Sequence, residues 1–154
     1  MKNALLLMLF CNLFIIGFSK GKHTAHIEKL RQTELDFSKL CGEKGMKVSF
    51  LFYADKDVIK AEGENQFPIF GIDSLAASFG EEREKFKLEW YPTKVEVSKS
   101  ADLGFTFGNW ILTKADGSKR YGVYYTVWKK QKDDTWKFIF DGGNSTPELT
   151  TFSK

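Results

Sequence analysis

Histidine and cysteine are scarce in this sequence, and their positions exclude several kinds of site. The chain of 154 residues has two histidines, His23 and His26, and two cysteines, Cys11 and Cys41. Neither pair lies in the kind of His/Cys cluster that holds zinc, so we expect no metal site. Both histidines precede the predicted core. Acid–base chemistry in the interior is therefore expected to depend on Asp, Glu or Tyr.

Phosphate-binding loops, dinucleotide fingerprints and nucleophile elbows are also absent from the sequence, so we expect no cofactor. A strong excess of one charge is lacking as well. The 23 Lys and Arg residues against 20 Asp and Glu give a net charge of +3. A nucleic-acid-binding domain of this size typically carries a much stronger basic bias, so no nucleic-acid partner is expected.

The first 19 residues are typical of a secretory signal peptide. Lys2 precedes an apolar run over 4–18, and the small residues Gly17 and Ser19 favour cleavage after Ser19. The run is short for a membrane span, which needs about 20 residues, although an uncleaved membrane anchor is the alternative to a cleaved signal peptide. After cleavage, no stable membrane insertion is expected. We therefore predict export, to the periplasm or the medium. The mature chain then keeps only Cys41 and has no internal disulfide.

The first half of the mature chain has the pattern of helices. Residues 24–45 predict a helix that Thr24 caps and Gly42 or Gly45 ends. A second short helix is expected within 45–54 and a third within 72–80, the latter capped by Asp73 or Ser74. Between them, residues 56–71 predict a short strand and a hairpin that turns at 63–65.

From residue 85 onward the pattern alternates between apolar and polar side chains. It predicts strands over 85–100, 103–114, 119–131 and 135–143, with a bulge or bend at Pro92. The turns between the last three strands are short, so these strands are expected to be antiparallel neighbours. Helices followed by an antiparallel meander indicate an α+β fold, in which a curved sheet wraps around the three N-terminal helices.

Neither face of the predicted sheet is polar, so both need cover. One face carries glycine, threonine, tyrosine and tryptophan, including Trp110, Tyr124 and Trp128. Glycines leave room and amphipathic rings combine apolar surface with polar tips, so we favour this face as a cavity wall. The alternative places the same rings in a dimer interface. In either case a symmetric dimer is the commonest way to cover the remaining face.

In chain order, the segments "ELDF", "PIFGIDSL", "GFTFGNW" and "YYTVWKKQKDDTWKFIFDGGNSTP" resemble the nuclear transport factor 2-like superfamily. Within it the sequence is most similar to the SnoaL-like and ketosteroid isomerase-like domains, closest to the domain of unknown function 4440 family. The resemblance implies a cystatin-like cone over residues 20–147, a pocket open at one end and frequent dimers, with 148–154 as a polar tail. It fixes no single function.

Two carboxylates are the candidate catalytic groups. Glu34 falls on the apolar stripe of the first helix, where burial is expected to raise its pKa, although a structural hydrogen bond is the plainer interpretation. Asp141 and Asn144 lie where the last strand ends, with an Asx turn as the plain alternative. Tyr53 is a further candidate. The full set of predicted pocket residues is Glu34, Tyr53, Trp110, Tyr124, Trp128, Asp141 and Asn144.

Three kinds of function are compatible with these residues. The first is an exported protein whose cavity binds a small, largely apolar molecule. The second is a lyase or isomerase that uses Glu34 or Asp141 as its base. The third is a protein-interaction module that docks a partner on its aromatic sheet face. Converging acid–base groups favour an enzyme, and a closed apolar interior favours the interaction module.

Overall fold

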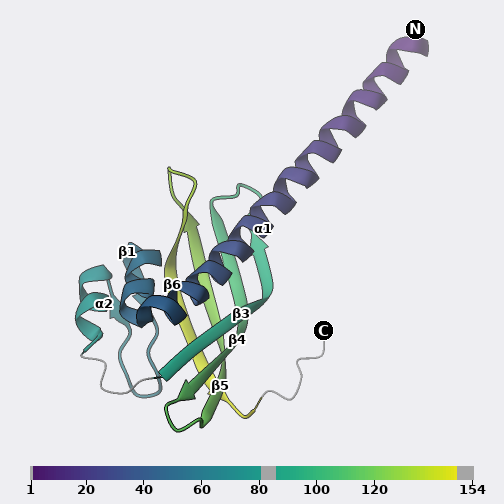
Figure 1. Ribbon diagram of the computed structural model, residues 1–154. Coiled ribbons are helices and arrows are strands. Elements are labelled where there is room, and N and C mark those ends of the chain that lie inside the picture. Colours follow the sequence, from purple (N-terminus) through teal and green to yellow (C-terminus); the bar gives the residue numbers. More distant parts are fainter. Residues whose placement is uncertain (1, 81–85, 149–154) are drawn as a thin grey trace.

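The computed structural model describes residues 2–80 and 86–148, and for residues 2–20 it describes the backbone alone. Within these ranges, two helices and six strands follow one another (Figure 1). The elements are α1 (Lys2–Tyr53), β1 (Ala54–Lys60), β2 (Ile69–Phe70), α2 (Ile72–Ser78), β3 (Phe86–Val97), β4 (Leu103–Lys114), β5 (Lys119–Lys130) and β6 (Trp136–Thr146). This order confirms the predicted α+β fold.

The first helix is longer than the sequence pattern predicted. Thr24 was expected to cap its start, but α1 begins at Lys2 and passes through Thr24, because no proline interrupts the backbone between these positions. The predicted end is confirmed at Gly45. This glycine has φ 82° and ψ 168°, a conformation that favours glycine, and a second helical segment follows it up to Tyr53. The expected short helix after Gly45 is thus present.

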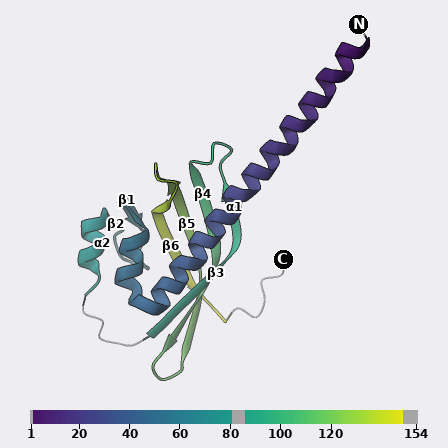
Figure 2. The ribbon, with the colours of Figure 1, turned by 45° about the horizontal axis from the view of Figure 1, so that its top comes forward.

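The six strands form one sheet in the order β2-β1-β6-β5-β4-β3. Neighbours from β6 to β3 are antiparallel, as predicted, whereas β1 runs parallel to β6. The predicted irregularity at Pro92 is confirmed as a register shift between Pro92 and Lys94, and a second shift lies between Val127 and Trp128. Bulges bend strands and increase their twist, so these two shifts help the sheet to curl (Figure 2).

The C-terminal half of α1 lies across the concave face of the sheet, while its N-terminal part projects beyond it (Figures 1 and 2). The apolar stripe on which Glu34 was predicted faces the sheet, and its members Leu30, Phe37 and Cys41 are buried in the core. Phe37 is at the centre, with ring centroids 4.7 Å from Trp90 and 5.6 Å from Phe138. The helix approaches β4 closely because Gly104 has no side chain: a Cβ there would lie 2.3 Å from Leu30.

Alternation along β4 and β5 separates the two faces as the sequence predicted. Thr106, Tyr124 and Trp128 are buried on the concave side, whereas Phe105 on the convex side is 38% exposed. The convex face is therefore a broad, partly exposed apolar surface. The concave face forms the core and the wall of a cavity.

The third predicted helix, α2, is present but is not capped as expected. Its N-cap is Gly71 rather than Asp73 or Ser74, and no side chain that the structure describes caps it. Gly71 has φ 79°, and its amide donates to the carbonyl of Val58, so the backbone of the preceding turn fixes the helix start. Asp73 lies in the first turn, where a carboxylate is favoured by the helix dipole.

Two predictions concern chain ends that the structure covers only in part. The backbone of residues 2–19, the predicted signal peptide, belongs to α1, and residues 149–154 of the predicted polar tail lie outside the described residues. Over residues 21–80 and 86–148, no helix is long and apolar enough to cross a membrane. Export and cleavage after Ser19 stay predictions.

Candidate functional site

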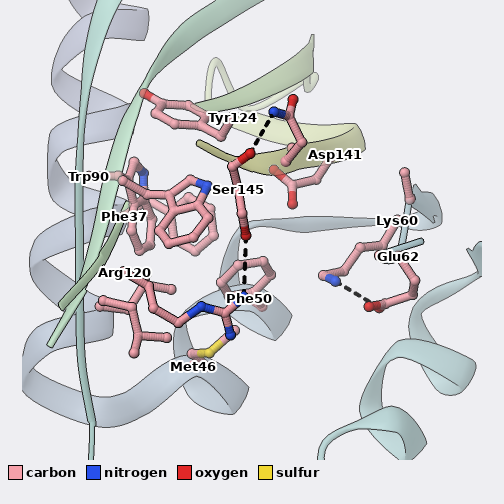
Figure 3. Close-up of a pocket in the computed structure, with 18 of the residues that line it drawn as sticks. Phe37, Met46, Phe50, Lys60, Glu62, Trp90, Arg120, Tyr124, Asp141 and Ser145 are labelled. Carbon is pink, nitrogen blue, oxygen red and sulfur yellow. Dashed lines mark hydrogen bonds and ion pairs between the residues drawn. The ribbon is translucent and has the colours of Figure 1, made fainter. Parts of the chain in front are cut away.

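A cavity of about 700 Å³ lies between the second half of α1 and the concave face of the sheet (Figure 3). Its inner wall is aromatic and apolar, and its mouth is polar. The apolar wall is formed by Phe37, Met46, Phe50, Leu88, Trp90, Trp110 and Leu112. Of the predicted pocket residues, the structure brings Glu34, Trp110, Tyr124, Asp141 and Asn144 to this cavity.

Glu34 is fully buried and joins α1 to three strands of the sheet. Its Oε1 accepts a hydrogen bond from Trp90 Nε1 on β3 at 2.6 Å. Its Oε2 accepts from Thr106 Oγ1 on β4 at 2.6 Å and from Trp128 Nε1 on β5 at 3.1 Å. Trp128 Nε1 also lies 3.0 Å from Thr106 Oγ1. Of the two interpretations of Glu34, this geometry favours a structural hydrogen-bond centre.

Burial and hydrogen bonding act on Glu34 in opposite directions. Desolvation raises the pKa of Glu34 from 4.5 to about 7, although the hydrogen bonds from Thr106 and Trp90 favour the charged form. The expected rise in pKa thus has its cause in burial. Since Glu34 is 0% exposed and bonded at both oxygens, it has little capacity left for a ligand.

Asp141 is held differently, with one oxygen fixed and one open. Thr126 Oγ1 donates to Asp141 Oδ1 at 2.8 Å. Among the described residues nothing donates to Asp141 Oδ2, and the side chain is only partly buried at the cavity wall (Figure 3). Desolvation raises the pKa of this carboxyl from 3.8 to about 6, while the hydrogen bond from Thr126 and the charge on Lys60 oppose the rise. Asp141 is therefore the carboxylate that is available to a ligand.

Tyr124 contributes a ring to the wall and a hydroxyl that is not satisfied. Its ring lies over Gly108, where a Cβ would come within 2.7 Å of the tyrosine Cε1. Its hydroxyl is buried and has no hydrogen-bond partner within the described part of the chain. Burial, followed by the charges on Glu34 and Asp141, raises the pKa of Tyr124, so the phenol stays protonated. In Figure 3 its hydroxyl end lies away from Asp141, so the two groups do not converge on one point.

Trp110 owes its position to a glycine on the neighbouring strand. Gly122 is paired with Trp110 across β4 and β5, and a Cβ on Gly122 would lie 2.1 Å from the indole ring. The indole Nε1 donates to the carbonyl of Val123 at 3.1 Å. The ring is thus held by this hydrogen bond in the space that Gly122 leaves free, and its apolar surface lines the cavity.

Charged and polar side chains surround the mouth of the cavity. Lys60 Nζ pairs with Glu62 Oε1 at 2.7 Å, and both side chains are largely buried. Arg120 donates to Ser145 Oγ at 3.3 Å (Figure 3). The exposed Asn144 lies beside Ser145 on β6. Asn144 therefore lies at the mouth, but β6 continues to Thr146, so Asp141 and Asn144 lie within the strand and not at the strand end or Asx turn that the sequence predicted.

Two predicted pocket residues, Tyr53 and Trp128, lie outside the cavity wall. Trp128 is 0% exposed, and Tyr53 packs on it with ring centroids 6.2 Å apart. Both also contact Phe37. Trp128 is on the concave face as expected, but its place near the end of β5 puts it beneath α1. Alternation predicts which face of the sheet a side chain lies on, but not whether its position along the strand is next to the cavity. The pattern therefore could not show that Trp128 lies outside the cavity wall.

Several wall residues were missed by sequence reasoning, and a signal existed for some of them. Met46 and Phe50 are four residues apart on the helical segment after Gly45, which predicts a shared face. Trp90 alternates inward with Val95 and Val97, once the bulge at Pro92 is counted. Lys60 and Arg120 had no such signal, because their place at the mouth depends on the curvature of the sheet. No group of three or more potential metal ligands occurs in the described ranges.

No protein-family model matches the sequence, and no curated protein matches it. Solved structures do match. An NTF2-like protein of unknown function from Pseudomonas putida superimposes with a TM-score of 0.68 at 12% identity, over 82% of this chain and 91% of that one. A ketosteroid isomerase-like protein from Erwinia carotovora atroseptica gives 0.65 at 16% identity, over 79% and 97%.

The association domain of CaMKII from C. elegans gives a TM-score of 0.62 at 14% identity, over 81% of this chain and 98% of that one. At such identities the likeness concerns the fold and not the activity. The narrower resemblance to the domain of unknown function 4440 family stays a prediction. The α1 helix, the order of the strands and these superpositions together show that the chain has the nuclear transport factor 2-like fold.

Proposed function

We propose that this protein binds a small molecule with a largely apolar body in the cavity between α1 and the sheet. The observation that supports this most is the combination of an aromatic wall with Asp141, whose Oδ2 has no partner among the described residues. Sites for small molecules typically join an apolar lining of several hundred Å³ to a few well-placed polar groups. Here Asp141 would accept a hydrogen bond from the ligand, and Trp90 and Trp110 would pack on its apolar body.

A second candidate function is acid–base catalysis with Asp141. Its pKa of about 6 suits a group that exchanges protons near neutral pH. A ketosteroid isomerase-like protein is among the structures that share the fold. However, the hydroxyl end of Tyr124 lies away from Asp141 in Figure 3, and both carboxyl oxygens of Glu34 already accept hydrogen bonds, so binding is the better-supported function.

We also propose that a second copy of the chain covers the convex face of the sheet. Asn109 on this face is 4% exposed, and its Oδ1 has no partner in the described residues although its Nδ2 donates to Tyr91 at 3.3 Å. Because Asn109 is covered within one chain, the support for a dimer comes from the exposed rings on the same face, Phe105 at 38% and Tyr91 at 47%. The apolar side chains around it are Phe105, Phe107, Ile111, Tyr121, Val123, Tyr125, Val127 and Phe140.

Native mass spectrometry of the full-length chain, expressed with its N-terminus and purified without denaturation, tests these proposals together. We expect a dimer of residues 20–154 with a reproducible extra mass, because the cavity retains ligand and the convex face needs cover. A bare monomer would contradict both binding of a retained ligand and the dimer. A subunit mass that includes residues 1–19 would contradict export by a cleaved signal peptide.

A further inference from the structure

Some of the charged groups that line the cavity form ion pairs, and others do not. Lys60 and Glu62 neutralise each other through their contact of 2.7 Å. Arg120 and Glu64 are exposed at the mouth. On the inner wall, Asp141 and Glu34 remain, and neither forms an ion pair within the described residues. Lys60 is paired with Asp141 across β1 and β6, but Glu62 neutralises its charge, so no unpaired cation among the described residues faces the carboxyl groups of the inner wall.

Asp141 is the carboxyl that a bound cation would reach. Thr126 fixes Oδ1 at 2.8 Å and is itself 1% exposed, so the orientation of the carboxyl is set by the core. Oδ2 can accept a hydrogen bond, and none of the described residues donates one to it. A carboxylate held in an apolar site without a partner is costly, and a cationic donor reduces this cost.

The aromatic rings of the wall favour the same class of ligand. Phe37, Phe50, Trp90 and Trp110 all line the cavity. The face of an aromatic ring, that of tryptophan above all, attracts an ammonium group when water is excluded. The rings thus suit both the apolar body of a ligand and a positive charge attached to it.

We propose that the ligand of this cavity is an organic cation, a protonated amine carried on an apolar body, with its ammonium group bound at Asp141 Oδ2. This inference rests on the proposed function and specifies the chemical class of its ligand. Glu34 would add a more distant negative charge when it is ionised. Arg120, which is exposed at the mouth, would disfavour a ligand whose cationic group stays outside the cavity.

The charged neighbours of Asp141 come from two other elements. The positive charge of Lys60, at the end of β1, lowers the pKa of Asp141, and the negative charge of Glu62, two residues later, raises it. Glu34 on α1 and Asp141 repel each other when both are ionised. Tyr124 on β5 stays uncharged. Affinity for an amine is therefore expected to increase as the pH rises through about 6, where Asp141 ionises. Affinity for a neutral analogue is not expected to follow this profile.

Three probes that share one apolar cage test the proposal: 1-adamantanemethylamine, 1-adamantanemethanol and 1-adamantanecarboxylate. Isothermal titration calorimetry of each against the purified protein at pH 7.5 gives three dissociation constants. We expect the amine to bind about tenfold more tightly than the alcohol, equivalent to one well-placed charge contact, and the carboxylate to bind most weakly. In Asp141→Asn the advantage of the amine over the alcohol is expected to disappear.

Asp57→Asn is the matched control, because Asp57 lies on β1, is exposed and pairs with Lys56 away from the cavity. It should keep the tenfold preference. Equal affinity for the amine and the alcohol in the unchanged protein would overturn the cationic ligand but leave the proposed function intact. A preference for the amine that persists in Asp141→Asn would overturn the assigned site. Binding of none of the three probes would contradict both the cationic ligand and the cavity function.

Discussion

Replacing Glu34 by alanine is expected to lower the free energy of unfolding by about 3 kcal/mol. The carboxylate accepts hydrogen bonds from Trp90, Thr106 and Trp128 inside the core. In the variant Trp128 keeps Thr106 as an acceptor at 3.0 Å, but the indole of Trp90 and the hydroxyl of Thr106 lose theirs. Each buried donor left without a partner costs roughly 1–3 kcal/mol. Urea denaturation at pH 7 measures the difference.

Glu43→Ala is the control for this substitution. Glu43 is on the same helix, and its side chain is 55% exposed, where it forms only a long contact of 3.9 Å with Lys39. Surface changes of this kind usually alter stability by less than about 0.5 kcal/mol. If Glu34→Ala were no more destabilising than Glu43→Ala, Glu34 would not be the hydrogen-bond centre that joins α1 to the sheet.

The stability of the unchanged protein is expected to fall as the pH rises from 5 to 8. Glu34 has a pKa of about 7 when folded and 4.5 as its ordinary value, so over this range the unfolded chain loses its proton before the folded protein does. The stabilisation is therefore present at low pH and is lost as the pH rises through 7. For a shift of this size the expected loss is about 2.5 kcal/mol. Urea midpoints at closely spaced pH values measure it.

Glu34→Gln isolates this contribution, because glutamine has a similar shape and does not titrate. All other ionisable groups are common to both proteins. The variant should keep only the smaller fall below pH 6 that Asp141 causes, since its pKa is raised from 3.8 to about 6. Parallel stability curves for the two proteins between pH 6 and 8 would show that Glu34 is already ionised in the folded state.

Periodicity was sufficient to predict the parts of the fold that depend on local pattern. The inward stripe of α1, the break at Gly45 and the bulge at Pro92 each follow from the type and spacing of a few residues. Two features were not local. The parallel contact of β1 with β6 joins segments about 80 residues apart, and the early start of α1 depends on the absence of a breaker before Thr24.

The candidate site could be predicted in part, for a similar reason. An acid on an apolar stripe must be buried with partners, so Glu34 was identifiable as unusual. Which partners it has depends on three strands meeting at one helix, and the donors Trp90, Thr106 and Trp128 could not be assigned from spacing. The sequence also could not show that Asp141 is more available to a ligand than Glu34. This difference arises because Asp141 accepts a side-chain hydrogen bond at one oxygen only, from Thr126.

The indole N–H signals of the four tryptophans test the central claim, that the cavity binds a small molecule, most directly. Trp90 and Trp110 line the cavity, whereas Trp136 is buried in the core away from it. In ¹⁵N–¹H spectra recorded during titration with 1-adamantanemethanol, we predict saturable shifts of the Trp90 and Trp110 signals and a stationary Trp136 signal. Shifts that never saturate, or that leave Trp90 and Trp110 unmoved, would contradict a binding cavity at this place in the fold.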